Sequence, residues 1–303
     1  PAAPDAPGPD PRLRREQWAP VSVGNRRLLR FADGRDVPMT TLAKRPGLFH
    51  LEGFLTSAEV DAILAAAPEA SFKASSVSNK GDIGSDKERV SETQFVEGRR
   101  PALMPLLERV ADLIGLPRPW VHATSMQVLR YSGTSYYATH YDSRPLETYE
   151  HCRKDWEETG LPPDGDSRCP RYVTILYYLS DVPAGGETCF PLADDPALAG
   201  LSDSQLFAHQ KEHKYFMRDA SMRCVKRGGA LFAAPKRGDA IMWYNYRLAE
   251  DGALGVVDGL AAHMAMIPAA GSVKLAANHW LTVPWWPEDA IAVGVGGAKA
   301  QEL

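Results

Sequence analysis

The chain contains 303 residues, of which 44% are apolar, so it is long enough for one large folded unit with appendages. Its net charge of −4 argues against a nucleic acid or an anionic membrane surface as the main partner, and we predict neither. No apolar run approaches the ~20 residues of a membrane-spanning helix, so no membrane span is expected in this chain.

Residues 1–45 are expected to form a Pro-rich N-terminal arm, because residues 1–20 are rich in Pro and Ala with little other apolar content. The chain begins at Pro1 rather than at Met, a pattern that removal of a signal or anchor segment leaves. The folded unit is predicted to span residues 46–290, and residues 291–303 are interpreted as a C-terminal tail.

Two helices are predicted near the start of the folded unit. A strand at 46–55 runs into the first helix, whose start is marked by Thr56 and Glu59 at the spacing of a capping box. Apolar residues at helical spacing predict the second helix over 101–114. The stretch 74–92 between them is polar and rich in Gly, Ser and Lys, and we expect a mobile loop that closes over the site as a lid.

From about residue 122 the pattern changes to short β-rich runs separated by Gly-containing turn signals. Many short strands after two helices indicate a mainly β protein with flanking helices. Its core is predicted to be a double-stranded β-helix (jelly roll) over about residues 122–285, with inserts at about 146–170 and 192–223. The expected strands cover residues 125–131, 136–141, 172–179, 187–190, 230–234, 240–244, 261–267 and 274–283.

One strand carries two residues that suit a metal. His140 and Asp142 are two residues apart, so an extended strand turns both side chains to the same face. A second, distant His would complete the 2-His-1-carboxylate triad of non-heme Fe(II) oxygenases. We favour His263 for this role, because it interrupts an apolar strand where an imidazole otherwise needs a buried partner. The other downstream candidates are His209, His213 and His279.

Lys274 opens the next strand, eleven residues after His263. A lysine that enters a run of small and aromatic residues is costly to bury without an anion. A dicarboxylate cosubstrate bound to the metal would supply that anion.

Four sequence blocks follow one another over about residues 125–284. They are Leu129-Arg130-Tyr131 with His140-Tyr141-Asp142, residues 173–182 running into Gly185-Gly186-Glu187-Thr188-Cys189-Phe190-Pro191, Pro235-Lys236-Arg237-Gly238-Asp239-Ala240 with Trp243, and His263 with Lys274 and Trp280. Their order and spacing make the chain resemble the collagen-type prolyl 4-hydroxylases among the Fe(II)/2-oxoglutarate dioxygenases. The segment from Gly47 is also similar to the part that precedes the barrel in that family.

The resemblance implies an enzyme that uses Fe(II), 2-oxoglutarate and O2, with ascorbate as an expected reductant, to hydroxylate a peptidyl residue, preferentially proline. Its partner would be a Pro-rich peptide or protein. The iron ligands it implies are His140, Asp142 and His263, and the implied 2-oxoglutarate contacts are Lys274, helped by Tyr131 and Thr174. The implied peptide contacts are Tyr137, Trp280, Trp243 and Arg89, the last within Arg89-Val90-Ser91-Glu92.

Two departures from the family pattern bear on the substrate. The family usually has ten residues, not eleven, between the distal His and the Lys, which predicts a one-residue bulge near residues 269–271. Both inserts are expected to lie beside the peptide groove.

Cys152 and Cys169 bracket the first insert, where they form either a disulfide or part of a set of unpaired core thiols. The last two residues match an ER-retrieval tail, so the secretory pathway, and within it the ER lumen, is the expected location.

Three alternatives stay open. The same chemistry could act on peptidyl lysine or on a free amino acid. The jelly roll could be a non-catalytic module that binds Pro-rich peptides. In a third reading, His209-Gln210-Lys211-Glu212-His213 fits the His-x-x-Glu-His pattern of a zinc metallopeptidase, with His209 and His213 as ligands.

Overall fold

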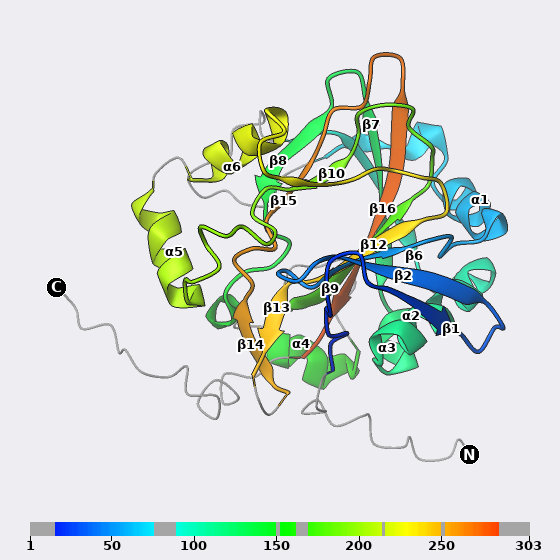
Figure 1. The fold of residues 1–303 in the computed structure, drawn as a ribbon. Helices are drawn as coiled ribbons and strands as arrows, with labels where there is room; N and C mark the ends of the chain where they lie inside the picture. The colour runs from blue at the N-terminus through cyan, green and yellow to red at the C-terminus, as the bar shows by residue number, and fades with distance from the viewer. Residues whose placement is uncertain are drawn as a thin grey trace.

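The computed structural model describes residues 16–75, 89–149, 152–161, 169–213, 216–249 and 252–284. Two antiparallel sheets form the body of the molecule, and helices lie outside them (Figure 1). This arrangement confirms the predicted jelly roll with flanking helices. The helices are α1 (Ser57–Ala66), α2 (Met104–Ile114), α3 (Arg118–His122), α4 (Cys152–Thr159), α5 (Asp203–Glu212) and α6 (Phe216–Val225).

The larger sheet has nine strands in the order β1-β2-β3-β12-β9-β16-β7-β6-β4. Its central strands, β9, β16 and β7, were all predicted from the sequence to within one or two residues. The strands are β1 (Arg26–Arg30), β2 (Asp36–Ala43), β3 (Leu48–Leu51), β4 (Lys73–Ala74), β6 (Glu92–Glu97), β7 (Ser125–Ser132), β9 (Arg171–Tyr178), β12 (Ala240–Tyr244) and β16 (Val273–Thr282).

The smaller sheet has five strands in the order β11-β10-β15-β8-β5, and β13 and β14 pair separately. The strands are β5 (Arg89–Val90), β8 (Tyr136–His140), β10 (Thr188–Phe190), β11 (Leu231–Ala233), β13 (Tyr246–Leu248), β14 (Leu254–Val257) and β15 (His263–Ala265).

The second half of the expected N-terminal arm, residues 1–45, is part of the folded β structure. Strands β1 and β2 lie within the first 45 residues and belong to the larger sheet. In β2, Val37, Met39 and Ala43 are buried and alternate with more exposed residues, as a half-buried strand requires. Residues 1–15, residues 76–88 of the lid expected at 74–92, and the tail at 291–303 lie outside the described residues.

Alternation along the central strands separates a helix-covered core from an inner face. Val173, Ile175 and Tyr177 of β9 pack with Val60 of α1 and Leu107 of α2 in the main apolar cluster. The intervening residues of β9 and β16 therefore point to the opposite side, toward the smaller sheet. The functional site lies between the two sheets, because Lys274 comes from this inner face whereas His140 and His263 lie on strands of the smaller sheet.

The predicted start of α1 is confirmed, because Thr56 and Glu59 form a complete capping box. Glu59 also accepts a hydrogen bond of 2.6 Å from Nη2 of Arg109, whose side chain is 1% exposed. This buried ion pair joins α1 to α2 behind the larger sheet.

One disulfide closes the first insert, and a second attaches the second insert to the smaller sheet. Cys152 of α4 is bonded to Cys169, which settles the alternative between a disulfide and free thiols in the first insert. The second pair, Cys189 of β10 with Cys224 of α6, was not predicted. Within the described ranges, no helix has the length and apolar character needed to cross a bilayer.

Candidate functional site

A bulge in β8 brings Tyr137 and His140 to one face. In a regular strand, residues three apart point to opposite sides. Here His140 pairs with His263 and Tyr137 pairs with Ala265, so β8 has one more residue than β15 over this interval. The two rings consequently stack, with centroids 3.5 Å apart and planes 20° apart.

His140, Asp142 and His263 converge as the sequence predicted. Their ligand atoms all lie within 4.8 Å of one another, and no second group of this kind occurs in the described part of the chain. Nε2 of His140 is 3.9 Å from Oδ1 of Asp142, and Nε2 of His263 is 3.6 Å from Oδ2 of the same carboxylate. Three ligand atoms on one side of a common point leave the opposite side open, as in a facial triad.

The backbone fixes both imidazoles in the form that binds a metal. Nδ1 of His140 lies 2.8 Å from the carbonyl oxygen of Ala138, and Nδ1 of His263 lies 3.0 Å from that of Ala261. A carbonyl only accepts, so each Nδ1 carries the hydrogen and each Nε2 keeps its lone pair. The donor set and its tautomers therefore fit a divalent first-row metal such as Fe(II).

Asp142 remains ionised although its side chain is buried. Burial alone would raise its pKa, but the electrostatic influence of the neighbouring His263 and His140 rings, the Arg171 guanidinium and a hydrogen bond from Thr174 outweigh burial, so the pKa is lowered. Oγ1 of Thr174 donates to Oδ2 of Asp142 at 2.7 Å. The carboxylate is thus held charged and oriented for a cation.

Thr174 does not lie where the resemblance suggested. It was expected to help Lys274 bind the far end of 2-oxoglutarate, but it pairs across the sheet with Trp280, six residues from Lys274 on β16. Six strand residues span ~20 Å. The hydroxyl of Thr174 also accepts from Nδ2 of Asn245 at 2.9 Å, so it belongs to the surroundings of Asp142.

Lys274 lines the same cavity as His140 and His263. Its side chain is 1% exposed, and burial lowers its pKa to about 7 against a weaker opposing effect of the charge of Glu187. Among the described residues, none donates to, accepts from or forms an ion pair with its ammonium group. Glu187 itself is paired with Arg227. An ammonium buried without a counterion beside a metal site is suited to bind an anionic group.

Tyr131, which was expected to help Lys274 bind the cosubstrate, does lie next to it. The two residues face each other across β7 and β16, and Nζ lies 5.4 Å from the ring centroid. A further residue of this part of the cavity was missed. Thr188 also lines the cavity, and its Oγ1 accepts from the hydroxyl of Tyr178 at 3.1 Å. Thr188 directly follows the Gly185-Gly186-Glu187 turn, which was the available signal in the sequence.

The predicted peptide contacts fall into different environments. Trp243 is 1% exposed and its ring packs edge-on against His263 at 4.7 Å, so it supports a ligand from within the core. Tyr137 and Trp280 are partly exposed near the metal ligands. Arg89 pairs through its backbone with Tyr137 at the edge of the smaller sheet.

Arg171 is a further residue that was missed. Its guanidinium lies 3.7 Å from the ring centroid of Trp280 and donates to the carbonyl oxygen of Asp142. A charged residue at the head of the apolar strand 171–178 is the same signal that identified Lys274.

The remaining histidines do not form a second centre in the described chain. His279 is fully buried, its two ring nitrogens contact Thr124 and Tyr177, and burial lowers its pKa to about 3. His209 lies on α5 and His213 follows it, both exposed. No third ligand from the described residues joins them, so the metallopeptidase reading has no support here.

A family model described as the 2OG-Fe(II) oxygenase superfamily matches residues 126–282. A probable prolyl 4-hydroxylase 4 of Arabidopsis thaliana is 31% identical over 245 residues, which are 80% of this chain and 69% of that protein. The transmembrane prolyl 4-hydroxylase of the mouse is 31% identical over 188 residues, or 62% of this chain. The match spans only 35% of that mouse protein, about a third of its length.

Among solved structures, a viral collagen prolyl hydroxylase from Paramecium Bursaria Chlorella virus-1 in complex with 2OG is 20% identical. It aligns over 77% of this chain and 94% of its own, with a TM-score of 0.42. A Trichoplax adhaerens prolyl hydroxylase bound to a peptide fragment of hypoxia inducible factor is 13% identical, covering 84% and 88% of the two chains with a TM-score of 0.44.

Proposed function

The chain belongs to the 2OG-Fe(II) oxygenase superfamily, and from this premise we propose that it is an Fe(II)- and 2-oxoglutarate-dependent dioxygenase that hydroxylates a peptidyl residue, preferentially proline. In this reaction one oxygen atom of O2 enters the substrate C–H bond, and the other is consumed as 2-oxoglutarate is converted to succinate and CO2. The single observation that carries the proposal is the convergence of His140, Asp142 and His263 beside a cavity lined by Lys274, for whose buried ammonium the described residues offer no ion pair.

His140, Asp142 and His263 would hold the iron through two Nε2 atoms and a carboxylate. When bound, Fe(II) supplies the activation of O2 that is coupled to 2-oxoglutarate oxidation. The carbonyl groups of Ala138 and Ala261 fix the imidazole tautomers. Because Thr174 keeps the carboxylate of Asp142 oriented before any cation arrives, the ligand set is preorganised.

Lys274 would bind the carboxylate of 2-oxoglutarate that lies away from the metal. The buried ammonium has no competing ion pair in the described chain, so the cosubstrate would supply the missing counterion. Tyr131 and Thr188 shape the cavity around this end. The buried position also excludes water from the cosubstrate and strengthens the ion pair.

The peptide would lie across the partly exposed rings of Tyr137 and Trp280. Aromatic faces suit the pyrrolidine ring of an extended, polyproline-like segment. Arg171, held against Trp280, presents a guanidinium that can donate to a peptide carbonyl. The preference for proline comes from the names of the related proteins, and peptidyl lysine remains the alternative substrate that the experiment below distinguishes.

The test combines purified protein with Fe(II), 2-oxoglutarate, ascorbate and a panel of Pro-rich and Lys-containing peptides. We expect succinate release and a mass gain of about one oxygen atom on proline, both lost in Asp142→Ala. Proline-free variants of the accepted peptide serve as substrate controls. Peptide binding without succinate release would favour a non-catalytic module, and oxygen on lysine would replace the proposed substrate.

We place the protein in the secretory pathway, with the ER lumen as the specific compartment. Two disulfides support this location, because such bonds persist in oxidising compartments. Ascorbate is proposed as the reductant that keeps the iron in the Fe(II) state between turnovers.

A further inference from the structure

The second insert packs against residues that flank all three proposed metal ligands. We call residues 192–213 and 216–227, which contain α5 and α6, the α5–α6 insert. Its buried residues Leu206 and Ala220 share an apolar cluster with Leu260 and Ala262, and Tyr141 packs against the same cluster. Tyr141 separates His140 from Asp142, while Ala262 directly precedes His263. The insert therefore lies behind the metal site, on the side away from the cavity.

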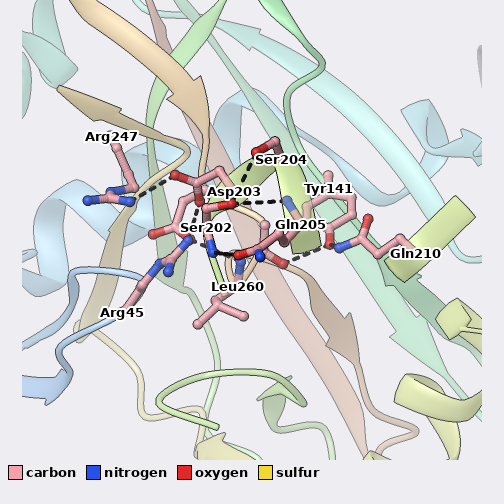
Figure 2. A network of polar contacts seen from close by, with 11 residues as sticks. Arg45, Tyr141, Ser202, Asp203, Ser204, Gln205, Gln210, Arg247 and Leu260 are labelled. Atoms are coloured by element: carbon pink, nitrogen blue, oxygen red, sulfur yellow. Dashed lines mark hydrogen bonds and ion pairs between the residues drawn. The ribbon is translucent and has the colours of Figure 1, made fainter. Parts of the chain in front are cut away.

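Ion pairs fix the start of α5. Asp203, the first residue of α5, is paired with Arg45 and Arg247, and its carboxylate is 10% exposed (Figure 2). Nε of Arg45 also contacts Asp258 at 3.2 Å, in the turn that precedes β15. The same two arginines thus attach α5 to the β body near the segment that carries His263.

A disulfide and a hydroxyl pair fix α6. Cys224 of α6 is bonded to Cys189, the neighbour of the cavity residue Thr188. Oγ of Ser221 contacts Oγ1 of Thr139 at 2.9 Å, one residue before His140. With both helices tied to the β body, the insert is a fixed support and not a closing lid.

Tyr141 connects the insert to the metal ligands through its hydroxyl group. Nε2 of Gln210, on α5, donates to the Tyr141 oxygen at 2.6 Å, and Figure 2 shows the two side chains meeting. The Tyr141 hydroxyl in turn donates to the carbonyl oxygen of Gly259 at 2.8 Å.

Gly259 lies in the turn that orients the third ligand. The amide of Ala261 donates to the carbonyl of Asp258 across this turn, and the carbonyl of Ala261 accepts from Nδ1 of His263. A Cβ on Gly259 would lie 2.4 Å from Cδ2 of Leu206, so α5 packs directly on the turn. The Tyr141 hydroxyl therefore bridges the segment 140–142, which carries two ligands, and the turn that sets the third.

We propose that Tyr141 and Gln210 are positioning residues for the metal site. Through them the α5–α6 insert keeps the segment with His140 and Asp142 at a fixed distance from the segment with His263. This inference rests on the proposed metal site and extends it to side chains that touch neither the metal nor the substrate. Loss of the Tyr141 hydroxyl releases the Gly259 turn, so the distance between His263 and the other two ligands, His140 and Asp142, is no longer fixed.

The test measures Co(II) binding to the full chain without substrate, by titration and by the visible absorption of bound Co(II), which reports ligand geometry. We expect Tyr141→Phe to weaken Co(II) about 10-fold or more and to alter the absorption band. Gln210→Ala should weaken it roughly 3- to 10-fold. Because Phe lacks the hydroxyl that Gln210 contacts, adding Gln210→Ala to Tyr141→Phe should cause no further loss.

Glu212→Ala is the matched control, since it shortens an exposed side chain two residues further along α5 and should leave the Co(II) affinity unchanged. Melting curves verify that each variant is folded. Wild-type affinity and absorption in Tyr141→Phe would overturn the inference, as would independent, additive losses in the double variant. Asp142→Ala distinguishes failure of this inference from failure of the proposed metal site. If this variant binds Co(II) as the wild type does, the proposed metal site itself is wrong.

Discussion

Lys274 makes cosubstrate affinity depend on pH in a defined direction. Its folded pKa is lowered to about 7, so the ammonium that pairs with 2-oxoglutarate is lost as the pH rises through about 7. The dissociation constant for 2-oxoglutarate should therefore increase above that pH, by up to about tenfold per unit. Titration of the metal-loaded protein between pH 6.5 and 9 measures it.

Lys274→Arg provides the control, because a guanidinium stays charged over this range. Its affinity profile should be nearly flat, whereas Lys274→Ala should bind 2-oxoglutarate far more weakly at every pH while retaining the metal. A wild-type profile that is flat, or an unchanged affinity in Lys274→Ala, would remove the lysine from the cosubstrate site.

A substitution at Thr174 distinguishes its observed contact with Asp142 from the expected role in binding 2-oxoglutarate. Thr174→Val keeps the shape of the side chain but removes the hydrogen bond to Asp142. We expect metal affinity to fall about 10-fold or more, while 2-oxoglutarate affinity at saturating metal stays close to wild type. Thr174→Ser should restore metal binding. The opposite pattern, with intact metal affinity and weakened cosubstrate, would return Thr174 to the far end of 2-oxoglutarate.

The sequence identified some residues of the site more securely than others. A charged or imidazole side chain inside an apolar strand is conspicuous, which is why His263 and Lys274 were found. Contacts across strands depend on register, which a single sequence does not display, so Thr174 was expected beside Lys274 whereas it is hydrogen-bonded to Asp142. The bulge that stacks Tyr137 on His140 has no sequence signal of its own.

At the scale of elements, the predicted strands of the jelly roll were found because each is a short β-rich run bounded by turn signals. Strands β1 and β2 were missed because their Arg and Thr content looks polar, although β2 buries every second residue. The α5–α6 insert was predicted to lie beside the peptide groove. Its location behind the metal site depends on ion pairs between residues as distant as Arg45 and Asp203.

The junction of α1 and α2 yields a stability prediction. Glu59→Ala removes one of the two carboxylate partners of the buried Arg109, which keeps Asp33, and should lower the free energy of unfolding by about 1.5–3 kcal/mol. Thr56→Ala, which removes only the N-cap of the same helix, should cost about 1 kcal/mol. Urea denaturation of both variants measures the difference. Equal losses would show that the ion pair adds nothing beyond the cap.

For the whole molecule, one disulfide closes the first insert and the other links the second insert to β10, and both should stabilise the fold in an oxidising compartment. They close loops of 17 and 35 residues, for which chain entropy gives about 3 and about 4 kcal/mol. Peptide mapping without reductant should recover Cys152–Cys169 and Cys189–Cys224, and reduction should lower the melting temperature. Free thiols with an unchanged melting temperature would contradict both the linkage and the proposed compartment.

The central claim is that one cavity holds Fe(II) through His140, Asp142 and His263 and 2-oxoglutarate through Lys274. The most direct measurement is an anaerobic titration of the Fe(II)-loaded protein with 2-oxoglutarate, monitored by the visible charge-transfer band of the Fe(II)–2-oxoglutarate chelate. We predict the band for the wild type, its absence in Asp142→Ala, and a much higher 2-oxoglutarate requirement in Lys274→Ala. No band in the wild type, or identical titrations in all three proteins, would contradict the account.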